Sequence, residues 1–192
     1  MDVKTIAVIG AGTTGRGIAC AAALGGYRTI LEDVMPENLA KGMAWIRQAL
    51  DDGVARGRLA PGIRDAALRR METARSIEDA SREADFLIEA VPEEAELKLE
   101  IFTLFDKFAR PAAVLASTTS AISIAELAAM TYRPEVCAGM RFVPPTPELR
   151  RVEIVRALRT SEETIAACCE AGRRMGLEVV VVKEPSGPVA TE

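Results

Sequence analysis

Short runs of apolar residues alternate with longer segments of helical periodicity along this chain of 192 residues. A continuous apolar run of strand length predicts a strand that is buried on both faces. Such runs occur at 3–9, 27–31, 86–91, 113–116, 136–140, 152–155 and 179–182. Because helical segments separate most of them, we expect an α/β domain with a mostly parallel sheet and helices on both faces.

The segments between these strands carry the spacing and the end signals of helices. Pro36 suits a first helical turn, and the helix behind it is predicted to bury one apolar stripe. That stripe consists of Leu39, Met43, Ile46 and Leu50. Further helices are predicted at 13–24, 93–108 and 123–130, with a break at 53–62. A last helix, running to Met175, is expected to start from a capping box of Thr160 and Glu163.

Composition narrows the classes of function. Hydrophobic residues make up 49% and charged residues 27% of the chain, as in a soluble globular domain. The net charge of −4 does not suggest a nucleic-acid partner. No run of about 18 apolar residues predicts a membrane span. Four cysteines without any histidine suggest buried thiols in a reducing compartment, so we expect no metal site and a cytoplasmic setting.

A glycine-rich loop follows the first predicted strand and opens the first predicted helix. Gly10, Gly12 and Gly15 have GxGxxG spacing within VIGAGTTGRG. In this context the first glycine permits a tight turn, the second lets the backbone approach a pyrophosphate, and the third lets helix and strand pack closely. The helix N-terminus adds amide donors and a favourable dipole. We therefore expect a Rossmann-type domain, and the candidate cofactor-binding residues here are Gly10, Ala11, Gly12, Thr13, Thr14 and Gly15.

An acidic residue at the end of the second strand completes this motif. Asp33 lies 18 residues beyond Gly15. Its carboxylate would accept hydrogen bonds from the adenosine ribose and repel a 2′-phosphate, which favours NAD over NADP.

Four stretches, in this order, resemble the 3-hydroxyacyl-CoA dehydrogenase family: VIGAGTTGRGIA, ADFLIEAVPEEAELK, LASTTSAISI and VEIV. The resemblance covers residues 4 to about 187 and matches the family's N-terminal NAD-binding domain. It implies hydride transfer between NAD and a 3-hydroxyacyl thioester. It also implies that residues 1–185 form the NAD-binding domain. Residues 186–192 would then begin a linker toward the family's helical domain, which the sequence does not contain.

The resemblance assigns candidate roles to residues of this chain. Glu93 and Lys98 match positions near the nicotinamide end of the cofactor, although both could simply be a solvated helix start. Ser120 matches a serine that touches substrate and nicotinamide, and it could also cap a helix. Glu153 matches the acid that orients the catalytic histidine. Arg56 matches a basic position that contacts the CoA phosphates, or it is merely solvated.

The sequence departs from the family at the catalytic segment. GMRFVPP stands where the family has GMHFFNP, so Arg141 occupies the position of the histidine. Pro144, Thr118 and Thr191 occupy positions where the family has asparagines. Arginine stays protonated and cannot accept the hydroxyl proton that a dehydrogenase must remove. We hypothesise that it either forms a bidentate pair with Glu153 or binds an anionic substrate group.

Three functional hypotheses follow. The first is an oxidoreductase acting on a 3-hydroxyacyl thioester with a disrupted proton relay, using another base or a partner that supplies the helical part. The second is a non-catalytic module that binds NAD(H) or an acyl thioester. The third is a dehydrogenase whose Arg141 holds the carboxylate of a hydroxy acid or hydroxydicarboxyl thioester. A homodimer is possible in each case, and fatty acid metabolism is the expected setting.

Overall fold

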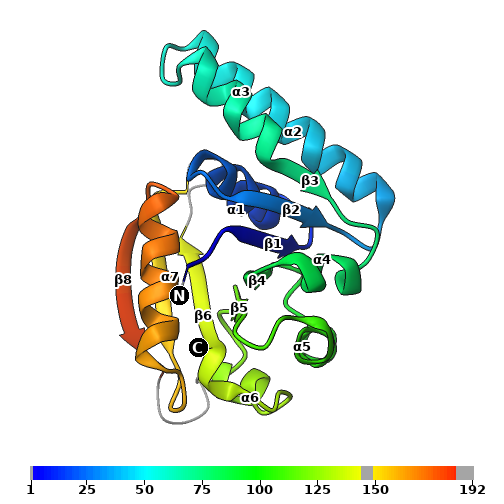
Figure 1. The fold of residues 1–192 in the computed structure, drawn as a ribbon, viewed down its shortest axis with the longest axis vertical. Helices are drawn as coiled ribbons and strands as arrows, with labels where there is room; N and C mark the ends of the chain where they lie inside the picture. Colours follow the sequence, from blue (N-terminus) through cyan, green and yellow to red (C-terminus); the bar gives the residue numbers. More distant parts are fainter. Residues whose placement is uncertain (1, 144–148, 185–192) are drawn as a thin grey trace.

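Eight strands form one sheet in the computed structural model, which describes residues 2–143 and 149–184 (Figure 1). The strand order is β3-β2-β1-β4-β5-β6-β7-β8, and every neighbouring pair is parallel except β6 and β7. The strands are β1 (Thr5–Ile9), β2 (Arg28–Glu32), β3 (Met71–Thr73), β4 (Phe86–Glu89), β5 (Val114–Ser117), β6 (Cys137–Val143), β7 (Arg151–Arg156) and β8 (Glu178–Lys183). The predicted Rossmann-type fold is confirmed.

Two helical layers cover the two faces of this sheet. The helices are α1 (Thr13–Leu24), α2 (Pro36–Ala55), α3 (Pro61–Arg70), α4 (Ile77–Glu83), α5 (Ala95–Phe108), α6 (Ile124–Ala128) and α7 (Glu162–Arg174), with a 3-10 turn at Pro134–Val136. One core packs buried side chains of α1, α2, α3 and α7 against one face, and the other packs α4, α5 and α6 against the opposite face. Alternation along β1 explains this division, because Ile6 and Val8 enter the first core and Ala7 and Ile9 the second.

Two predicted local features differ from the structure. Ser161, not Thr160, caps α7 by accepting a hydrogen bond from the Thr164 amide at 3.1 Å. The Thr160 hydroxyl is already used, because it donates to the Cys137 carbonyl at 2.7 Å. Ser123, not Ser120, caps α6.

Some predictions fall outside the described residues, namely Pro144, Thr191 and the linker at 186–192. In the described part of the chain, no helix has the length and apolar content needed to cross a membrane.

Candidate nucleotide-binding and catalytic site

The glycine loop joins β1 to α1 in a turn that excludes larger side chains. Gly10 has a φ of +102°, and a Cβ there would lie 2.7 Å from the Ala90 carbonyl oxygen. A Cβ on Gly15 would lie 1.8 Å from the Gly10 carbonyl oxygen. At Gly12, by contrast, a Cβ would meet nothing within 4 Å. Packing therefore requires glycine at positions 10 and 15, whereas the absence of a side chain at Gly12 leaves space beside the loop.

Asp33 is fixed beside this loop. One carboxylate oxygen accepts a hydrogen bond from the Ala11 amide at 2.8 Å, and the other accepts one from the Met35 amide at 2.9 Å. The carboxylate is thus positioned at the end of β2, next to the first turn of α1. This is the arrangement on which the predicted ribose contact depends.

Side chains that lie on or shortly after four strands line a cleft of about 410 Å³ beyond the loop. Ser120 follows β5, Arg141 lies on β6, Glu153 on β7 and Glu93 after β4. Thr14, from the first turn of α1, also lines the cleft. The structure therefore brings most of the residues predicted from the resemblance into one place.

Of the two alternatives for Arg141, the pair with Glu153 is not formed in the structure. These residues are directly opposite in the antiparallel register of β6 and β7. Glu153 nevertheless pairs with Arg151, at 3.1 Å between Nη2 and Oε1, and Arg141 donates from Nε to the Thr119 carbonyl oxygen at 3.0 Å. Arg141 is therefore held against the turn that follows β5.

Lys98 does not face the cleft and is not part of a solvated helix start. Its ammonium group is fully buried and lies 2.7 Å from Oε1 of Glu89, which is also fully buried. Glu89 additionally accepts hydrogen bonds from the Val91 amide at 2.7 Å and the Ser117 hydroxyl at 2.6 Å. Sequence reasoning missed Glu89, although an acid that ends the apolar run FLIE requires a buried partner.

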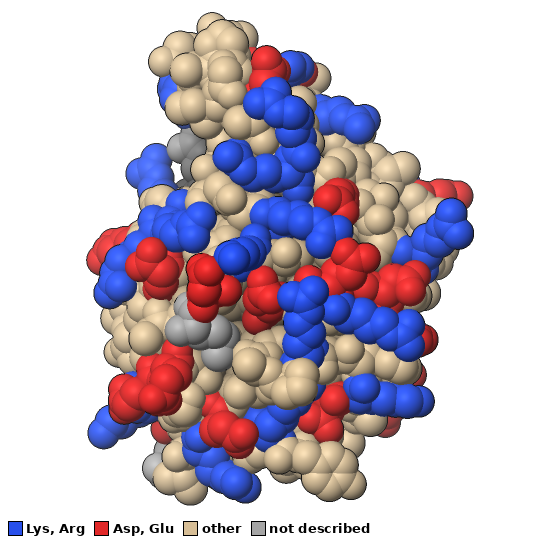
Figure 2. All heavy atoms as spheres, in the orientation of Figure 1, with Lys and Arg blue, Asp and Glu red and all other residues tan. Residues whose placement is uncertain are grey.

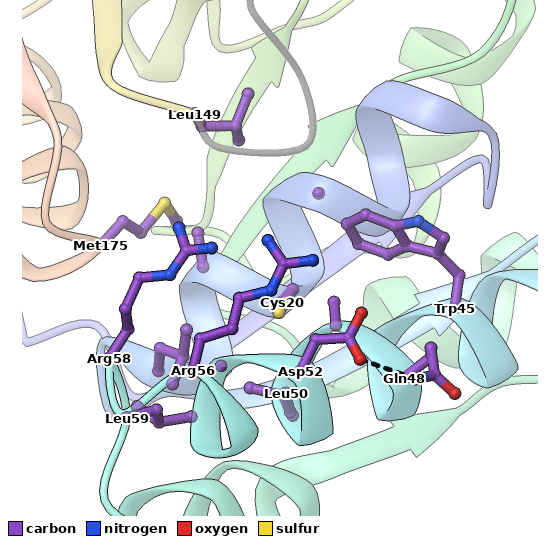
Figure 3. Close-up of a pocket in the computed structure, with 15 residues that line it drawn as sticks. Cys20, Trp45, Gln48, Leu50, Asp52, Arg56, Arg58, Leu59, Leu149 and Met175 are labelled. Carbon is purple, nitrogen blue, oxygen red and sulfur yellow. Dashed lines mark hydrogen bonds between the residues drawn. The ribbon is translucent and has the colours of Figure 1, made fainter.

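A second cavity, of about 500 Å³, lies between α1, α2 and the chain near Leu149 and Met175 (Figure 3). Arg56 and Arg58 extend into it from the end of α2, and Trp45 forms part of its wall. The guanidinium group of Arg16 lies 4.8 Å from the centroid of the Trp45 ring, and its buried Nε has no hydrogen-bond partner among the described residues. This cavity combines apolar walls with cationic groups.

The comparisons with known proteins agree with this geometry. The family model for the NAD-binding domain of 3-hydroxyacyl-CoA dehydrogenase matches residues 5–185. The chain belongs to this family. It is 35% identical over 190 residues to a probable 3-hydroxybutyryl-CoA dehydrogenase of Bacillus subtilis, covering 99% of this chain and 66% of that protein. It is also 36% identical to the 3-hydroxyadipyl-CoA dehydrogenase of Escherichia coli, covering 94% of this chain and 38% of that protein.

Solved structures of the family have the same fold. The (S)-3-hydroxybutyryl-CoA dehydrogenase PaaH1 from Ralstonia eutropha superposes with a TM-score of 0.91 at 34% identity, over 98% of this chain and 66% of that one. The chain thus spans about two thirds or less of the length of these dehydrogenases.

The residues of the glycine loop fit the NAD of this family. Gly12 is the N-cap of α1 and supplies no side-chain cap. The first hydrogen bond of this helix runs from the Arg16 amide to the Gly12 carbonyl oxygen. In the described chain, the amides of Thr13, Thr14 and Gly15 therefore have no backbone acceptor, so they can donate to a pyrophosphate. NAD is the cofactor of this family, and when bound it would supply the hydride acceptor or donor.

Burial raises the pKa of two titratable groups next to these sites. Glu32 ends β2 beside Asp33, and burial raises its pKa to about 7, with a smaller contribution from the Asp33 charge. Burial likewise raises the pKa of the Cys20 thiol in the second cavity to about 11. Cys20 is therefore a neutral thiol near pH 7 and a poor nucleophile.

Proposed function

We propose that this chain binds NAD and an acyl-CoA thioester as part of a 3-hydroxyacyl-CoA dehydrogenase-type oxidoreductase whose proton relay is disrupted. One observation carries the proposal. The cleft that would receive the reacting carbon contains Arg141 where the family resemblance expects a histidine, and the sequence contains no histidine at all. Oxidation of a secondary alcohol requires a group that accepts the hydroxyl proton, and a guanidinium group does not accept one.

Glu153 is a weak substitute for that base. Its carboxylate is already held by Arg151, at 3.1 Å between Nη2 and Oε1, and is not free for a substrate hydroxyl. We therefore expect cofactor binding to be retained and turnover on ordinary 3-hydroxyacyl thioesters to be slow. In this proposal Gly12 and the loop amides hold the pyrophosphate, Asp33 the ribose, and Ser120 and Glu93 line the nicotinamide end.

The second cavity supports the acyl-CoA part of the proposal. Arg56 enters a space whose walls include Trp45 and Leu149, so it offers one cation for a phosphate and apolar surface for an aromatic base. Lys and Arg side chains also gather over the upper part of the molecule, where α2 and α3 lie (Figure 2). The proposal includes a helical domain, reached through residues 186–192 or contributed by a partner subunit, that would cover the cleft.

Cofactor choice is tested by titrating the protein with NADH and NADPH and following NADH fluorescence. We expect binding of NADH with a clear preference over NADPH, and Asp33→Asn should reduce this preference. Absence of NADH binding would refute the proposal. Trp45 is the single tryptophan of the chain, so quenching of its emission by CoA tests the second cavity in the same protein.

The disrupted relay is tested by assaying acetoacetyl-CoA reduction for the unchanged chain and for Arg141→His. Turnover of the unchanged chain at rates typical of enzymes, roughly 1–1000 per second, would contradict the proposal that the chain lacks a catalytic base. A gain of tenfold or more in the turnover of Arg141→His, measured at saturating NADH, would support it. If the unchanged chain binds both ligands and neither protein turns over, the non-catalytic module is the better description.

A second candidate function rests on the terminal nitrogens of Arg141. Within residues 2–143 and 149–184 only Nε is engaged, so both η nitrogens can donate to a ligand in the cleft. A guanidinium fork matches a carboxylate, which would suit a hydroxydicarboxyl thioester. Comparing the affinities for 3-oxoadipyl-CoA and acetoacetyl-CoA tests this reading. Arg141→Met should abolish any preference for the diacid, and Arg159→Met, at an exposed turn, is the matched control.

A further inference from the structure

Thr119 lies where the ends of three strands converge. The residue is fully buried in the turn between β5 and α6, immediately before the exposed Ser120. Its hydroxyl donates to Oε1 of Glu93, which follows β4. Its carbonyl oxygen accepts from Nε of Arg141, on β6, at 3.0 Å. A single residue of this turn is thus hydrogen-bonded to β6 on one side and to the segment that follows β4 on the other.

The turn is also organised from within. The Thr119 amide donates to the Ser117 hydroxyl at 3.1 Å, and the Thr119 hydroxyl accepts from the Ile122 amide at 2.9 Å. Ser117 in turn donates to the buried Glu89, which Lys98 neutralises. Every polar group of Thr119 therefore has a partner, and the partners are themselves anchored.

Ser120 depends on these contacts for its place. Its own amide is 3.4 Å from Oε2 of Glu93, a long hydrogen bond, and its side chain faces the cleft of Arg141 and Glu153. The stronger restraints on the turn act one residue earlier, at Thr119. The orientation of the cleft wall is consequently set by a residue that does not line the cleft.

We propose that Thr119 is a positioning residue that fixes Ser120 at the nicotinamide end of the cofactor site, and that Arg141 acts in this chain as the second tether of the same turn. The role of Ser120 at the nicotinamide end rests on the proposed function. The arrangement explains how arginine can occupy the position of a base without loosening the cleft. Where the resemblance leads us to expect a proton acceptor, the guanidinium group instead donates a hydrogen bond that holds the turn.

The variant Thr119→Val removes the hydroxyl and keeps the shape of the side chain, while Thr119→Ser keeps the hydroxyl. We measure the affinities of both variants for NADH and for ADP-ribose, which lacks the nicotinamide. Thr119→Val removes the hydrogen bonds of this hydroxyl to Glu93 and to the Ile122 amide. It should weaken NADH binding roughly fivefold to tenfold and leave ADP-ribose binding unchanged. Thr119→Ser should restore the NADH affinity. Equal weakening of both ligands, or no change in either, would overturn the proposal.

Amide hydrogen exchange provides a readout that needs no ligand. In Thr119→Val the amides of Ser120 and Ile122 should exchange roughly tenfold faster, while amides of β1 keep their rates. Arg141→Met should accelerate exchange at Ser120 in the same way. If NADH and ADP-ribose fail to bind even the unchanged protein, the proposed function fails, and exchange alone decides the role of Thr119. Unchanged exchange at Ser120 in both variants would refute it.

Discussion

Replacing Glu32 by glutamine should change how the stability of this protein depends on pH. Glu32 is only 3% exposed, and its pKa rises from an ordinary value of 4.5 to about 7 in the fold. Between pH 4.5 and about 7 the folded state therefore holds a proton that the unfolded chain has released, so stability is greatest below pH 4.5 and falls as the pH rises through this range. The contribution disappears as the pH rises through about 7. The difference between these two values, at about 1.4 kcal/mol per pH unit, amounts to at most roughly 3 kcal/mol.

The assay is urea unfolding of the unchanged protein and of Glu32→Gln at several pH values from 4.5 to 8, followed by circular dichroism. Glutamine stays neutral, so the variant should gain stability relative to the unchanged protein as the pH rises, by up to roughly 3 kcal/mol. A constant difference between the two proteins across this range would refute the reasoning. Glu37→Gln, at an exposed position in the first turn of α2, controls for the loss of a surface charge.

Two further predictions concern the buried Lys98–Glu89 pair and the glycines of the loop. Lys98→Met leaves the carboxylate of Glu89 buried without its ion-pair partner, and should lower the free energy of unfolding by about 3–5 kcal/mol in urea titrations. The double variant with Glu89→Gln should recover much of that loss, and failure to recover would show that the ion pair is not the cause. Gly12→Ala should fold with an unchanged melting temperature and lose NADH affinity, because its Cβ enters only the space beside the loop. Gly15→Ala should instead fail to fold or lose stability strongly, since its Cβ would lie 1.8 Å from a backbone oxygen.

The parts of the fold with strong local signals were predictable from the sequence. The helix predicted at 13–24 matches α1, and the predicted strands overlap β1, β2, β4, β5, β6, β7 and β8. The missed elements α3, β3 and α4 lie where few residues are buried, such as Ala67 and Ala80, so no apolar stripe marks them. One readable signal was overlooked. Ser76 caps α4 by accepting from the Asp79 amide at 3.1 Å.

In the candidate site, too, the features that depend on local sequence were predictable and those that depend on distant segments were not. The glycine loop and Asp33 depend on backbone geometry close in sequence, so spacing alone located them. The partners of Arg141 and Lys98 depend on competition between side chains that distant segments bring together. Arg151, two residues from Glu153 on the same face of β7, takes that carboxylate, and the carbonyl of Thr119 takes the guanidinium group. Strand register shows which residues are opposite one another, but it does not decide which of several acceptors a long side chain reaches.

The placement of these groups also explains how the catalytic segment can change without loss of the cofactor site. The pyrophosphate and ribose contacts proposed here come from the ends of β1 and β2, whereas Arg141 and Glu153 lie on β6 and β7, on the far side of β4 and β5. The contacts that shape the glycine loop come from Asp33 and Ala90, so a substitution on β6 leaves them in place. It does touch the turn after β5, because β6 is the neighbour of β5 and Arg141 reaches the carbonyl of Thr119. Restoring a histidine at position 141 would thus supply a base and at the same time remove a tether. If the proposed function holds, proton transfer and the placement of Ser120 would therefore be coupled through this one side chain.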